Sequence, residues 1–267
     1  MRYHHLGKTE LQVSVIGFDG TFGGRGPFAD RLAERDVRRQ ALDALHSAVR
    51  AGINYFDCGN DEGDGRFTDL LGEGAEGVRS KVFLAAGYDF RRMPTLHEQR
   101  TELLLATLDR LRTNHVDVLQ FHAAVWDDDL AARLIGSGLL DWADEMHRRG
   151  YYRYAGVSAE TPSTGLQQLV RTDRFDLLRL RHSAFFPGND QQPAAVIPFA
   201  LSMGVGVVAT CDPGAAQSAL SDAVYTPEVH CTVLEMTTPE EVWACAEMAS
   251  DVTRLLDVAR PPGRAES

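Results

Sequence analysis

The sequence has few cysteines, few basic residues and no long apolar run, and each shortage excludes a class of protein. Its 267 residues include four cysteines, none of them in a Cys-x-x-Cys pair, so neither a disulfide framework nor a zinc site is indicated. Lys and Arg number 27 against 38 Asp and Glu, a formal net charge of −11. That surplus of acid disfavours a nucleic-acid partner or an anionic membrane surface. No segment approaches the ~18 apolar residues of a membrane span.

The same shortages set an expectation for location. The first ten residues, MRYHHLGKTE, lack the apolar segment of a secretory signal, and free cysteines suit a reducing compartment. Hydrophobic residues make up 44% and charged residues 24%, which is typical of a globular protein and excludes a disordered chain. We therefore expect a cytoplasmic protein with a small-molecule substrate and with no nucleic-acid or membrane partner. No pattern predicts its oligomeric state.

What the sequence does contain is a regular alternation of short β-branched runs with segments of helical periodicity. The clearest helical segments are 35–52, 97–112, 129–149, 192–203 and 238–256, another begins at Thr161 and Pro162, and the poorest is 66–77. Before the first strand, residues 2–13 read as a hairpin with its turn at Gly7 and Lys8. The eight expected strands are 13–18, 53–58, 81–86, 116–122, 152–158, 175–181, 205–211 and 229–235.

Eight strand and helix units in 267 residues predict the fold. Strands that alternate with helices favour a parallel sheet, and the length is near the ~250 residues typical of one (β/α)₈ barrel. We expect the α/β class and a single TIM barrel over residues 1–256, with a disordered tail at 257–267.

In such a barrel the active site lies at the C-terminal ends of the strands. Those ends carry many ionisable groups, which are costly to bury unless they are paired, so the cluster is a candidate site. The ends include Asp19, Asp57, Glu62, Tyr88, Gln120, His122, Ser158, Arg179, Arg181, Asp212 and Glu235.

Six segments of the sequence, taken in order, resemble motifs of the aldo-keto reductase superfamily. They are RYHHLGKTELQVSVIGFDGTFGG, GINYFDCGNDEG, SKVFLAAG, VDVLQFH, RRGYYRYAGVSA and TTPEEVWACAEMA. The resemblance implies a barrel whose floor is closed by an N-terminal hairpin, and NAD(P)H-dependent reduction of a carbonyl. It also implies a catalytic Asp, Tyr, Lys and His.

The match to those four residues is incomplete. Asp57 and His122 stand at the Asp and His positions, whereas Glu62 replaces the Tyr and Gly87 replaces the Lys. Two tyrosines lie close in sequence: Tyr88 follows Gly87, and Tyr55, two residues before Asp57, should point into the barrel one layer deeper.

The positions that hold the cofactor in that family also differ. Ser158 is kept, but Ala159 replaces an Asn, Arg179 a Gln and His182 an aromatic residue. Asp212 and Glu235 would repel phosphate. We therefore expect that no cofactor is used and assign no cofactor-binding residues, with NADPH as the alternative.

These differences lead to a hypothesis of cofactor-independent acid–base chemistry, of the lyase, dehydratase, isomerase or cyclase type, on a small polar or anionic metabolite. Glu62 and His122 would exchange protons and Asp57 would orient one of them, while Arg179 would hold an anionic group. No metal is expected, because the spacing of a helical metal motif is missing. The expected catalytic residues are Asp57, Glu62 and His122, and the expected substrate-binding residues are Tyr88, Gln120, Trp126, Arg179 and Ser158.

Two other functions stay open. One is an atypical NAD(P)H-dependent aldo-keto reductase in which Tyr88 or Glu62 donates the proton. The other is a non-catalytic partner protein on the barrel scaffold. Each residue also has a structural interpretation: Glu62 as a solvated loop residue, His122 as a core histidine, and Arg179 as the neutraliser of a nearby carboxylate.

Overall fold

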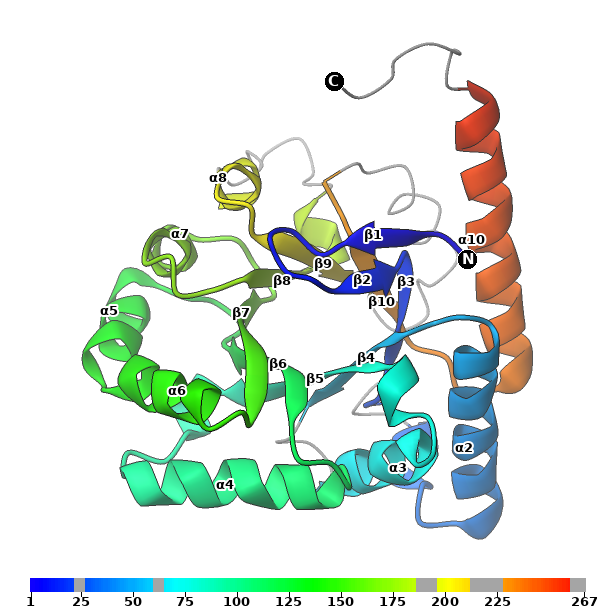
Figure 1. The fold of residues 1–267 in the computed structure, drawn as a ribbon, viewed down its shortest axis with the longest axis horizontal. Helices are drawn as coiled ribbons and strands as arrows, with labels where there is room; N and C mark the ends of the chain where they lie inside the picture. Colours follow the sequence, from blue (N-terminus) through cyan, green and yellow to red (C-terminus); the bar gives the residue numbers. More distant parts are fainter. Residues whose placement is uncertain (22–26, 60–64, 186–195, 212–227, 260–267) are drawn as a thin grey trace.

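Eight parallel strands form the centre of the molecule. The computed structural model describes residues 1–21, 27–59, 65–185, 196–211 and 228–259. The strands are β3 (Ile16–Asp19), β4 (Tyr55–Gly59), β5 (Phe83–Asp89), β6 (Val116–His122), β7 (Tyr152–Ala159), β8 (Leu177–Arg181), β9 (Gly206–Thr210) and β10 (Cys231–Leu234). They close into a barrel in the order β10-β3-β4-β5-β6-β7-β8-β9 (Figure 1). The predicted (β/α)₈ barrel is confirmed.

A two-stranded hairpin lies against the N-terminal end of this barrel. Strands β1 (Tyr3–His5) and β2 (Gln12–Ser14) pair antiparallel, as the turn at Gly7 predicted. Gly7 has φ +56°, and a Cβ there would lie 2.3 Å from the backbone N of Gly206. The turn therefore touches the start of β9, and Leu6 and Leu11 pack into the lower barrel interior.

Helices surround the barrel (Figure 1). They are α1 (Pro27–Asp30), α2 (Arg35–Arg50), α3 (Arg66–Ala75), α4 (His97–Arg110), α5 (Asp128–Gly136), α6 (Leu139–Arg148), α7 (Thr164–Arg171), α8 (Val196–Ser202) and α10 (Pro239–Ala259), with 3-10 turns η2 (Arg79–Lys81), η3 (Phe90–Arg92) and η4 (His182–Ala184). Among the described residues, no helix combines the length and the apolar character that a bilayer crossing requires.

Several expected boundaries differ from the structure, and three helices show why. The helix expected over 129–149 is two helices, because Gly138 adopts φ +69° and interrupts it. The helix expected from Thr161 begins at Thr164, where the Ser163 hydroxyl caps the first turn by accepting a hydrogen bond from the backbone N–H of Leu166. Helix α10 continues to Ala259, and residues 260–267 of the expected tail lie outside the described residues.

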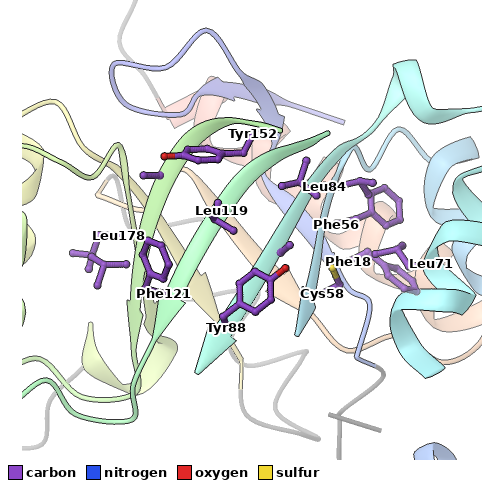
Figure 2. Packing of buried hydrophobic residues seen from close by; sticks show 14 of the residues in the cluster. Phe18, Phe56, Cys58, Leu71, Leu84, Tyr88, Leu119, Phe121, Tyr152 and Leu178 are labelled. Carbon is purple, nitrogen blue, oxygen red and sulfur yellow. The ribbon is translucent and has the colours of Figure 1, made fainter. Parts of the chain in front are cut away.

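Strand residues alternate between two cores. Outward-facing residues such as Phe56, Cys58 and Tyr88 pack beneath the helices (Figure 2). Inward-facing Tyr55 lies in a second, smaller cluster inside the barrel, one layer below Asp57, as predicted. This alternation decides which residues at the strand ends can reach the barrel mouth.

Candidate active site

A pocket of about 530 Å³ opens at the C-terminal ends of the barrel strands. Because inward-facing residues of the parallel strands meet there, it collects side chains that are distant in sequence. Five of the eight residues predicted for the site line it, namely Asp57, Gln120, His122, Ser158 and Arg179. The structure thus brings most of the predicted site together.

An ion pair crosses the deep end of this pocket. Arg179 Nε lies 2.6 Å from Asp57 Oδ2, in the alignment of a charge pair rather than of a well-directed hydrogen bond. Gln120 Nε2 donates to the other carboxylate oxygen at 3.5 Å. Burial raises the pKa of Asp57, and the Arg179 guanidinium opposes that rise. The structure therefore supports the structural interpretation of Arg179, in which its guanidinium neutralises a carboxylate, here that of Asp57.

A second polar pair joins the ends of β6 and β7. His122 and Ser158 are register partners, and His122 Nδ1 lies 2.9 Å from Ser158 Oγ. Burial lowers the pKa of His122, and the positive charge of Arg179 lowers it further. The imidazole is therefore neutral at pH 7 and has a defined partner at one of its two nitrogens.

Two predicted substrate-binding residues lie outside the pocket. The Tyr88 hydroxyl donates to Thr107 Oγ1 on α4 at 2.8 Å, so its ring points away from the barrel interior, among the outer-core residues (Figure 2). Trp126 is fully buried, and its Nε1–H donates to the backbone O of Ser158 at 2.9 Å. Both predictions are corrected: Tyr88 packs in the outer core, and Trp126 supports the strand end that carries Ser158.

The remaining polar residues of the mouth are partly paired. Arg181 bridges Glu160 at 3.1 Å, and Asp19 accepts hydrogen bonds from the N–H and hydroxyl of Thr21. The pKa of Glu235 is raised, first by burial and then by the Asp19 charge. Glu62 and Asp212 lie outside the described residues.

Sequence reasoning left open which carboxylate Arg179 would neutralise, and the structure pairs it with Asp57 across the barrel. The signal for it is strand alternation, which places both residues on inward faces. Within the described part of the chain, no three His, Cys, Asp or Glu side chains gather into a possible metal site.

Comparison with known proteins identifies what this arrangement resembles. The family model described as Aldo/keto reductase family matches residues 21–259. An uncharacterized oxidoreductase of Bacillus subtilis, YqkF, is 23% identical over 217 residues, which cover 78% of this chain and 64% of that protein. The chain therefore spans less than two thirds of that relative's length.

Solved structures share the fold at low identity. PA4992 of Pseudomonas aeruginosa superposes with a TM-score of 0.75 at 20% identity, over 94% of this chain and 95% of that one. An aldo-keto reductase from Klebsiella pneumoniae, solved in complex with NADPH, superposes with a TM-score of 0.71 at 16% identity, over 100% and 97% of the two chains.

Two predictions made from the sequence are wrong in the light of these matches. The cofactor-independent acid–base reaction is overturned by the family match over 21–259 and by the oxidoreductase relative. The expectation of no cofactor is overturned by the same family match together with the NADPH complex among the structural neighbours. The same findings favour the alternative of nicotinamide-dependent chemistry.

Proposed function

Because this chain belongs to the aldo/keto reductase family, we propose that it is an oxidoreductase that interconverts a small carbonyl compound and its alcohol with a nicotinamide cofactor. The observation that carries the proposal is the convergence of Asp57, His122 and Ser158 on one pocket at the barrel mouth. The NADPH bound to the Klebsiella pneumoniae protein supports the choice of cofactor.

The described pocket residues fit the polar end of a nicotinamide. A carboxamide has an acceptor oxygen and an NH₂ donor. Gln120 Oε1 is buried and has no hydrogen-bond partner among the described residues, so it is an acceptor for that NH₂. The terminal nitrogens of Arg179, which also lines the pocket, are donors for the oxygen. When bound, the cofactor supplies the hydride.

The remaining chemistry falls to the protein's own side chains. We assign to His122 a hydrogen bond to the carbonyl oxygen: when Nδ1 accepts from the Ser158 hydroxyl, Nε2 carries the proton and acts as donor. A neutral imidazole polarises a carbonyl without becoming the proton source. The Arg179 guanidinium stabilises negative charge on the same oxygen, and Asp57 fixes that guanidinium by the ion pair.

The proton must then come from another group. Tyr88 faces α4, which leaves Glu62, at the position of the family's tyrosine, as the proposed donor. A carboxyl group can serve as general acid when a desolvated or acidic setting raises its pKa.

Turnover tests the proposal. Purified protein is incubated with NADPH or NADH and a panel of aldehydes, ketones, sugars and 2-oxo acids, and absorbance of the reduced cofactor is followed. We expect at least one carbonyl to be reduced, with kcat in Glu62→Gln lower by about 10²-fold or more. An unchanged rate in Glu62→Gln would remove Glu62 from the mechanism. No consumption across the panel in either direction would count against the function itself.

A further inference from the structure

The Asp57–Arg179 ion pair spans the full width of the barrel. Asp57 lies on β4 and Arg179 on β8, and the order of strands puts four steps between them in either direction around the ring. The two strands are therefore on opposite sides of the barrel. Arg179 thus crosses the barrel from β8 to reach the Asp57 carboxylate. A residue on β3 or β5, the strands beside β4, would have a shorter distance to cover.

The neighbouring strand β5 leaves that shorter path open. Its register pairs Asp57 with Ala85 and Gly59 with Gly87, so Gly87 faces inward just above the carboxylate. Among the described residues, a Cβ at Gly87 would meet only Cys58 O at 3.8 Å and Gln120 Cβ at 4.0 Å. Strand β5 thus offers space and no cation next to Asp57.

Arg179 also sets the charge around His122. Its guanidinium opposes the burial that raises the pKa of Asp57, and it adds to the burial that lowers the pKa of His122. The other charged groups that act on Asp57 include Asp19. Those that act on His122 are Asp89, Glu160 and Arg181. Of all of these, Arg179 is the charged group that acts most strongly on both residues.

We infer that Arg179, besides its contacts with the bound molecules, has a positioning role in the active centre: it is a cation that reaches across the barrel from β8 and pairs with Asp57 beside Gly87. Through this pair it fixes the carboxylate and Gln120 and keeps His122 in its neutral hydrogen-bonding form. The inference rests on the proposed function, and it adds a role for a residue that the comparisons do not assign.

The test is a nuclear magnetic resonance titration of His122 in the full-length protein, without cofactor, with labelled histidine and the peak assigned by loss in His122→Gln. In Arg179→Gln we expect His122 to titrate at higher pH than in the wild type, because a neighbouring positive charge is removed. In the double variant Arg179→Gln/Gly87→Lys we expect the titration to move back toward the wild-type position, because the new lysine supplies the cation from β5.

A matched control separates this role from general stability. Arg79 pairs with Asp117 at 2.9 Å, with side-chain exposures of 24% and 3% that are close to the 26% and 6% of Arg179 and Asp57. Asp117 also contacts Arg153 and lies outside the pocket. Arg79→Gln should leave the His122 titration unchanged.

Activity supplies the second readout. We expect kcat/KM of Arg179→Gln to fall by roughly 100-fold, as misplaced catalytic groups do, and the lysine at position 87 to restore at least about tenfold. If Arg179→Gln does not fold, Arg179→Met takes its place: it keeps an unbranched side chain but removes the positive charge, so His122 should again titrate at higher pH than in the wild type. The inference is overturned if His122 titrates at the same pH in the wild type and in a folded Arg179 variant. It is also overturned if His122 titrates at the same pH in the double variant as in Arg179→Gln alone. Because the titration needs no cofactor, a shift without NADPH binding would contradict the proposed function alone.

Discussion

Replacing Asp57 by alanine is expected to cost about 3 kcal/mol of the free energy of unfolding. The substitution leaves the Arg179 guanidinium without its carboxylate in a largely buried position, and breaking a buried pair in this way typically costs about 3–5 kcal/mol. The lower end applies because Arg179 lines the pocket and water there can solvate its terminal nitrogens.

Denaturant unfolding followed by circular dichroism measures this loss. The control is Glu76→Ala, which removes an exposed partner of Arg112 and should change stability by less than about 1 kcal/mol. A loss in Asp57→Ala no larger than in this control would mean that the cross-barrel pair contributes little to the fold.

The second large effect is expected in His122→Ala, with kcat/KM lower by about 10² to 10³-fold. Removing a hydrogen-bond donor aimed at a developing oxyanion has an effect of this size. The backbone of Ser158 would stay in place, but its hydroxyl would lose its hydrogen-bond partner, His122 Nδ1 at 2.9 Å. Steady-state kinetics of NADPH oxidation measure the change, and the expected loss lies in kcat rather than in cofactor affinity.

His147→Ala is the matched control for that variant. His147 Nδ1 contacts the backbone O of Tyr152 at 3.2 Å, away from the pocket, so its replacement should leave turnover within about twofold of the wild type. Equal activity in both histidine variants would rule out the assigned role of His122.

The pH dependence has a definite sign. Burial and Arg179 lower the pKa of His122 from its ordinary 6.5, so the neutral form prevails above that value. As the pH falls through the lowered pKa, the imidazolium forms and Nδ1 can no longer accept from Ser158. The contribution of His122 to activity should therefore be constant above pH 6.5 and be lost as the pH falls through the lowered pKa, and this step should be absent from the profile of His122→Ala.

The barrel could be predicted from the sequence because the patterns that mark its strands and helices lie within short segments of the chain. The strands 116–122 and 152–158 coincide with β6 and β7 to within one residue, since apolar periodicity and flanking turns mark them. The break between α5 and α6 was missed, because Gly138 within an amphipathic pattern is tolerated in many helices.

The site was predicted only in part, because the prediction depends on the direction in which each side chain points from its strand. Tyr88 was assigned by its nearness to a strand end, although alternation from Gly87 turns it outward toward α4. The partner of Asp57 could not be chosen from sequence, because it depends on how the barrel closes and on which inward side chain is long enough to cross it. The wrong prediction of a lost cofactor came from giving the replaced catalytic and cofactor positions, taken together, more weight than the family motifs that run along most of the chain.

Titration of the purified protein with NADPH and with NADH tests the central claim most directly. The signal is tryptophan fluorescence, since Trp126 bonds to the backbone of Ser158 at the pocket wall, with calorimetry as a second readout. The account predicts saturable binding of one of the two cofactors with a Kd on the order of micromolar. The absence of binding at millimolar concentrations of both would contradict it.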